Sequence, residues 1–66
     1  MELVDAILKS KSGQAEKKNL RTGKITIVRA CGYGIGSLRV ISSYTDPTVV
    51  RKLTQKELDS PNWEPI

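Results

Sequence analysis

The sequence contains no histidine and no phenylalanine, and Cys31 is its single cysteine. Without histidine, a Ser-His-Asp triad, a Cys-His pair and an imidazole metal ligand are all excluded. A lone cysteine forms no intramolecular disulfide, whereas small secreted domains normally carry several. We therefore expect a non-enzymatic protein of a reducing compartment, the cytoplasm, with no catalytic residues, no cofactor and no metal site.

Long hydrophobic runs are missing as well. No apolar stretch approaches the roughly 20 residues that a membrane-spanning helix needs. Acidic Glu2 and Asp5 stand where a secretory signal would carry its basic region, so the pattern predicts no signal peptide. On this basis we expect no membrane partner.

The length of 66 residues limits the chain to one small domain. Domains near this size bury only about 60% of the surface that the unfolded chain exposes, so many gain stability from a partner. A protein partner or a homodimer is therefore a hypothesis from size alone. We assign residues 1–66 to a single domain, residues 10–23 to a basic flexible loop, and residues 60–66 to an extended tail. Trp63 and Ile66 of that tail are expected to pack back on the body.

Alternating β-branched residues predict a hairpin in the middle of the chain. Its strands are "KITIVRAC" (24–31) and "SLRVISSY" (37–44), both typical of half-buried strands. A third strand is expected near 48–53, and the capping-box pattern of Thr54 and Glu57 predicts a helical turn over 54–59. The order of these elements resembles an SH3-like barrel. We thus predict a mainly β fold, a small twisted sheet or SH3-like barrel built on the 24–31/37–44 hairpin, with a short C-terminal helical turn.

Two segments keep an α+β fold open as an alternative. The apolar residues of "MELVDAILKS" form one helical stripe but also suit a buried strand. Asp46 and Pro47 suit the first positions of a helix. In this alternative, the β-hairpin is packed by helices 1–10 and 47–59. The loop 10–23 has room for a helical turn around 15–20.

The glycines of "GYGIG" (32–36) raise the question of a phosphate-binding loop. Their G-x-G-x-G spacing lacks the third glycine of a dinucleotide-binding fingerprint, and a strand follows where a helix is needed. The glycines therefore predict a hairpin turn. At this turn, Tyr33 is either exposed for stacking on a base or folded over the edge of the core.

Basic residues dominate the first half of a chain whose formal net charge is +4. Such asymmetry suits an anionic partner, although net charge also serves solubility alone. Our first hypothesis is a small nucleic-acid-binding or regulatory accessory protein that uses a basic loop and the hairpin. The alternative is a protein-protein interaction module, an inhibitor or adaptor, docking an acidic or strand-edge partner. The candidate nucleic-acid-binding residues are Lys17, Lys18, Arg21, Lys24, Arg29, Tyr33 and Arg39.

Overall fold

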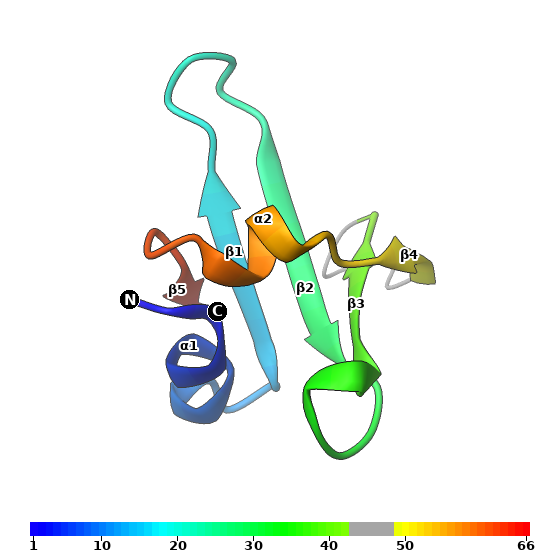
Figure 1. Cartoon of the computed structure of the whole chain (residues 1–66). Helices are drawn as coiled ribbons and strands as arrows, with labels where there is room; N and C mark the ends of the chain where they lie inside the picture. Colours follow the sequence, from blue (N-terminus) through cyan, green and yellow to red (C-terminus); the bar gives the residue numbers. More distant parts are fainter. Residues whose placement is uncertain (43–48) are drawn as a thin grey trace.

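A five-stranded antiparallel sheet forms the framework of the computed structural model, which describes residues 1–42 and 49–66 (Figure 1). The strands are β1 (Gln14–Lys18), β2 (Ile25–Ala30), β3 (Leu38–Ile41), β4 (Val49–Lys52) and β5 (Glu64–Pro65). Their order in the sheet is β4-β3-β2-β1-β5. The helices are α1 (Leu3–Lys9), α2 (Gln55–Asp59) and a short 3-10 helix (Ile35–Ser37). None of the described helices is long and apolar enough to cross a membrane.

The predicted mainly β fold is confirmed. β2 and β3 pair as an antiparallel hairpin from Ala30 opposite Leu38 to Ile27 opposite Ile41. β4 and α2 lie within the ranges expected for the third strand and the helical turn. The outer ends of the predicted strands, residues 43, 44 and 48, lie outside the described residues.

The sheet is open, because β4 and β5 stand at its two edges in the part of the chain that the structure describes. The SH3-like barrel therefore stays a prediction. Of the two helices in the α+β alternative, α1 forms within 1–10, but a single helix over 47–59 is wrong. Residues 49–52 pair with β3 instead, and Thr54 begins a new helix as its N-cap. Residues 47 and 48 lie outside the description.

The assignment of residues 10–23 to a flexible loop is wrong at its centre. Gln14–Lys18 form β1, which pairs with β2 from Gln14 opposite Arg29 to Lys18 opposite Ile25. The helical turn suggested around 15–20 is wrong for the same reason. β1 contains no β-branched residue, so its conformation comes from pairing with β2 and β5 rather than from propensity.

The main core cluster lies on one face of the sheet, under α1 and the C-terminal segment, while Ile27 and Ile41 are buried opposite each other on the other face. Ala15, Val28 and Val40 are in register on the face under α1 and are buried together with Leu3 and Ala6 of α1 and with Trp63. The Trp63 indole N–H donates to the Glu57 carbonyl oxygen at 2.9 Å.

The tail returns to the body as expected for Trp63, which is fully buried. Its backbone N–H donates to the Met1 carbonyl oxygen at 2.9 Å, and its own carbonyl accepts from the Met1 amino group at 3.0 Å. Ile66 is attached through its backbone N–H, which donates to the Gln14 carbonyl oxygen at 3.0 Å, while its side chain stays 36% exposed. The two ends of the chain therefore lie side by side (Figure 1).

Candidate nucleic-acid interface

The β1–β2 hairpin projects beyond the rest of the sheet (Figure 1). Among the described residues, β5 pairs with β1 only as far as Glu16, and β3 pairs with β2 only from Ile27 onward. The β1–β2 ladder continues past both neighbours, with Lys17 opposite Thr26 and Lys18 opposite Ile25. We call residues 17–26 the arm. At about 3.3 Å per strand residue, its tip lies about 13 Å beyond Glu16.

Hydrogen bonds define the turn at the tip of the arm. The Asn19 carboxamide oxygen accepts from the backbone N–H groups of Arg21 at 2.9 Å and of Thr22 at 3.3 Å. The Gly23 N–H donates to the Asn19 carbonyl at 2.7 Å, and the Asn19 N–H donates to the Lys24 carbonyl at 2.8 Å. Gly23 has φ +74°, which glycine adopts without steric cost. The turn therefore presents the exposed side chains of Arg21 and Lys24 from a fixed backbone.

Three cations lie in register across the face of the sheet opposite the core. Arg29 of β2 stands opposite Arg39 of β3, and Arg39 stands opposite Lys52 of β4. We call these three residues the basic row. Like charges directly opposite each other on neighbouring strands lower stability. Repulsion between neighbouring members of the row therefore opposes the pairing of these strands.

No acidic side chain of the described residues forms an ion pair with the basic row, although Glu16 of β1 lies on the same face of the sheet, diagonal to Arg29. The one ion pair among them joins Arg51 and Glu57, with 2.7 Å between Nη1 and Oε1. The Arg39 guanidinium donates from Nη1 to the carbonyl oxygen of Leu38 at 2.8 Å, a partner that carries no formal charge. An anion placed against the row would lower the repulsion among its three cations.

The basic row and the arm lie at opposite ends of β2. Lys18 pairs with Ile25, which places it on the same face of the sheet as Arg29. Lys24 immediately precedes β2, and Arg29 is its penultimate residue, so the two are separated by about 17 Å along the strand. That separation exceeds the roughly 12 Å width of the DNA major groove. The two groups can thus contact phosphates on both sides of a groove.

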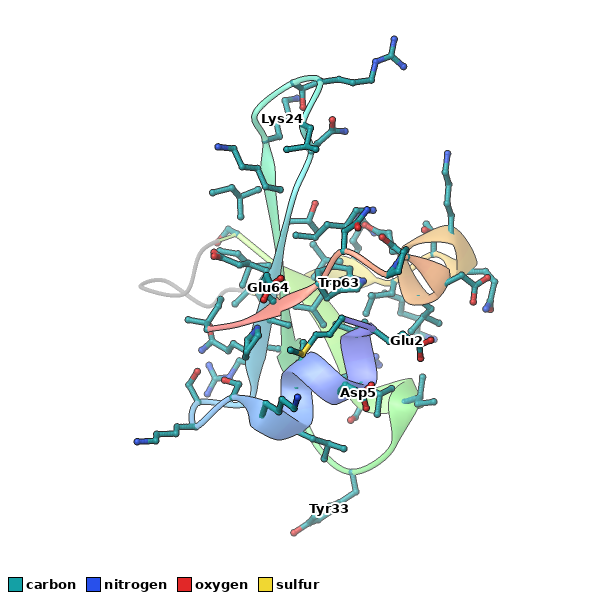
Figure 2. All side chains as sticks on the ribbon, turned by 90° about the vertical axis from the view of Figure 1, so that its left-hand side faces the viewer. Glu2, Asp5, Lys24, Tyr33, Trp63 and Glu64 are labelled. Carbon is teal, nitrogen blue, oxygen red and sulfur yellow. The ribbon has the colours of Figure 1, made fainter. Side chains whose placement is uncertain are left out.

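Two of the predicted residues have side chains directed away from these cations, although Lys17 belongs to the arm. Lys17 is on the core face, with its ammonium nitrogen 5.9 Å from the centre of the Trp63 ring, a distance at which cation–π attraction acts. Tyr33 is fully exposed in the loop between β2 and β3, at the end of the molecule opposite Lys24 (Figure 2). Its exposure excludes packing over the core edge, and stacking on a base stays a prediction.

The glycine segment forms the predicted hairpin connection. Within it, the Cys31 N–H donates to the Ser37 carbonyl at 3.1 Å, and the Ser37 N–H donates to the Gly34 carbonyl at 3.2 Å. Gly34 has φ +85°, a conformation that favours glycine. The segment therefore connects the two antiparallel strands as a loop over residues 31–37 that contains the 3-10 helix.

Lys52 belongs to the basic row but is not among the residues predicted from the sequence. Its place depends on the register between β3 and β4, which shifts between Val40 and Ile41. An irregularity of this kind reverses which side chains share a face and leaves no mark in a single sequence. In the sequence, only the alternation of side chains along the predicted third strand could have indicated the face on which Lys52 lies.

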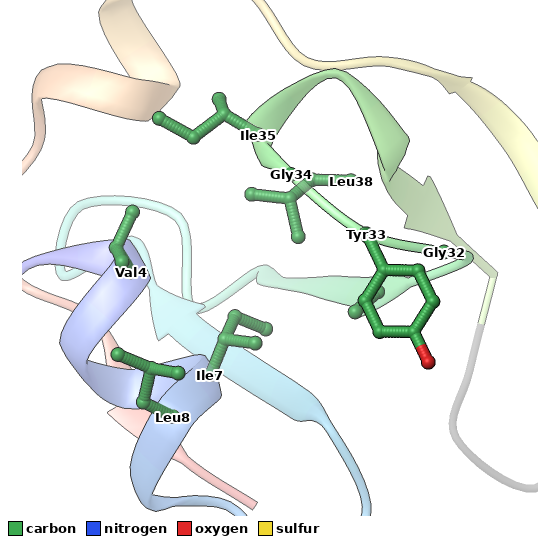
Figure 3. Close-up of a pocket in the computed structure, with 9 residues that line it drawn as sticks. Val4, Ile7, Leu8, Gly32, Tyr33, Gly34, Ile35 and Leu38 are labelled. Atoms are coloured by element: carbon green, nitrogen blue, oxygen red, sulfur yellow. The ribbon is translucent and has the colours of Figure 1, made fainter.

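An apolar groove of about 300 Å³ lies between α1 and the β2–β3 loop (Figure 3). Val4 and Leu8 of α1 line it on one side, and Tyr33 and Ile35 line it on the other. Elsewhere, the described residues contain no group of three or more histidine, cysteine or acidic side chains arranged to hold a metal ion.

Comparison with protein-family models, with curated proteins and with solved structures finds no match to this chain.

Proposed function

We propose that this protein binds nucleic acid without catalysing a reaction, and that the basic row and the arm contact its phosphates. The basic row is the observation that carries the proposal, because Arg29, Arg39 and Lys52 repel one another across strands spaced about 4.8 Å apart. Phosphate groups above the row would remove that repulsion. An accessory or regulatory protein of this kind acts by occupying its binding site on the nucleic acid.

The arm supplies the second set of phosphate contacts. Lys18, Arg21 and Lys24 are exposed, and the hydrogen-bonded turn fixes the backbone that carries the latter two. Neutralising phosphates with these cations releases condensed counterions, which drives association at low salt. The separation of about 17 Å between the row and the arm tip suits a duplex, whose two backbones flank a groove.

Fluorescence anisotropy with labelled duplex DNA, single-stranded DNA and RNA tests this function. The variant R29Q/R39Q/K52Q removes the charges of the row but keeps long polar side chains. Its matched control, K9Q/K11Q/K56Q, replaces three exposed lysines outside the row and the arm. Both variants lower the formal net charge from +4 to +1 because each removes three cations.

We expect the row variant to bind duplex DNA at least about tenfold more weakly than the wild type, and the control to lose much less. Equal losses in the two variants would show that net charge alone attracts the nucleic acid. Absence of wild-type binding to all three nucleic acids at low salt would refute the proposal.

The edge of β4 favours a second candidate function, that of a protein-interaction module. β4 is an edge strand of the described sheet, so its backbone is open to an added strand. Exposed Lys52 suits an acidic extended segment at this edge. In the same anisotropy assay, a labelled acidic peptide that binds while all nucleic acids fail to bind would favour this function. Trp63 offers no anchor to a partner, because it is fully buried.

We also propose that the protein works in a reducing compartment such as the cytoplasm. Cys31 is an exposed free thiol, and oxidising compartments convert such thiols to disulfides between molecules. Covalent dimers formed under air and dissolved by a thiol reductant are the expected behaviour of the purified protein. If the Cys31 thiol stays free under prolonged oxidation, the proposal of a reducing compartment loses its support.

A further inference from the structure

Leu20 is the most exposed large aliphatic side chain of the described residues, at 92% exposure. It stands in the turn at the tip of the arm, between Asn19 and Arg21. Tight turns usually hold glycine, asparagine, aspartate, serine or proline, each of which helps to form the turn. Leu20 belongs to no described core cluster, supplies no side-chain hydrogen bond, and lines only a hollow on the flank of the arm with Lys18 and Ile25. Its contribution to the core is therefore small.

The arm holds the backbone at Leu20 in a defined position. The Asn19 carboxamide and the Gly23 N–H hold the turn, and two ladder pairs connect it to the sheet. A group fixed before binding loses less conformational entropy when it enters a ligand. The arm's reach of about 13 Å exceeds the roughly 7.5 Å depth of the DNA minor groove. Leu20 can therefore reach the base pairs while the sheet stays outside the groove.

We propose that Leu20 is a wedge that enters the minor groove of duplex DNA and inserts between two base pairs, bending the duplex. The proposal rests on the nucleic-acid-binding function proposed above and names the form of nucleic acid and the deformation. Apolar side chains inserted in this way partly unstack a base step and kink the duplex. Arg21 and Lys24 stand beside the wedge, where they can contact the flanking phosphates.

B-form DNA suits this wedge better than an RNA duplex does. Pyrimidine–purine steps such as TA unstack easily in DNA and lower the cost of a kink. The A-form minor groove is wide and shallow, and proteins recognise it mainly by shape and by its 2′-hydroxyls. We therefore expect bending of duplex DNA that contains a central TA step, and no comparable bending of an RNA duplex.

Energy transfer between dyes at the two ends of a duplex of about 25 base pairs measures the bend. The variants are L20A, which removes the wedge, and L20M, which keeps a long apolar side chain at the tip. Ile25→Ala is the matched control, because Ile25 is a 55% exposed aliphatic residue of the same arm that lies below the turn. Circular dichroism verifies that each variant keeps the fold.

We expect the wild type, I25A and L20M to bring the duplex ends together and L20A to leave the bound duplex straight. Loss of the bend in L20A that L20M restores supports the wedge, whether or not affinity also falls. A bend of equal size in L20A, or wild-type binding without any bend, overturns the wedge and leaves nucleic-acid binding intact. Bending of the RNA duplex alone overturns the assignment to DNA, and absence of all binding overturns both proposals.

Discussion

Glu57 should make the stability of this protein depend on acidity. Its carboxylate accepts from the Arg51 guanidinium at 2.7 and 2.8 Å and from the Thr54 backbone N–H at 2.9 Å. The hydrogen bonds from Arg51 and then Thr54 outweigh the effect of partial burial and lower the pKa of Glu57 from 4.5 to about 2. Below pH 4.5, the unfolded chain therefore binds more protons at this site than the folded protein does.

The size of the effect follows from the shift and from the exposure of the pair. At 1.36 kcal/mol per pKa unit, the shift corresponds to at most about 3 kcal/mol. Water screens the interaction because the Arg51 side chain is 47% exposed, so we expect about 1 kcal/mol in practice. This stabilisation is complete above pH 4.5 and is lost as the pH falls through 4.5 toward about 2.

Thermal unfolding of the wild type and of Glu57→Gln across this pH range measures the contribution. In a domain of this size, about 1 kcal/mol corresponds to about 4–8 °C in Tm. We expect the wild type to exceed E57Q by about that margin at pH 7 and the two Tm values to converge in acid. The difference between the variants removes the effects of the other carboxyl groups. A constant gap down to pH 2, or no gap at pH 7, would refute the reasoning.

Two further substitutions test the packing and the glycine turn. Trp63→Ala should lower the free energy of unfolding by about 3–5 kcal/mol, because the ring is fully buried and its N–H is bonded; a chemical denaturation curve close to that of the wild type would contradict this. Gly34→Ala should lower the free energy of unfolding by about 1 kcal/mol or more, because alanine is strained at the φ of +85°. Gly36→Ala should lower it less, because Gly36 lacks a positive φ. Steric contact does not distinguish the two sites, since neither has an atom within 4 Å of the added methyl. Equal melting temperatures for these two glycine variants would contradict the strain expected from a side chain at position 34.

The sequence predicted the elements whose signals are local. The alternation along 24–31 and 37–44 gave the β2–β3 hairpin, and the pattern of Thr54 and Glu57 gave α2 with both hydrogen bonds of its capping box. β1 was missed because "QAEKK" has no local preference for a strand, and its conformation depends on β2 and β5. The helix at 3–9 stayed open because short apolar runs fit two periodicities.

Prediction of the candidate site failed where it depended on β1 or on β4. The hairpin was predicted correctly, and it is this hairpin that places Arg29 opposite Arg39. Lys17 faces Trp63 because alternation along β1 turns it toward the core, which a loop assignment does not reveal. Lys52 required the register of β4, and that register includes an irregularity. Exposed positions on local elements were thus predictable, whereas the faces set by distant pairing were not.

The salt dependence of duplex DNA binding tests the central claim most directly. Six cations, three in the basic row and the three exposed ones of the arm, predict a slope of about −5 for the logarithm of the binding constant against the logarithm of salt concentration. The variant R29Q/R39Q/K52Q removes three contacts, so its slope should fall to about −3, while K9Q/K11Q/K56Q should keep the wild-type slope. Identical slopes for the wild type and the row variant would contradict the account, because the basic row would then make no contact with phosphate.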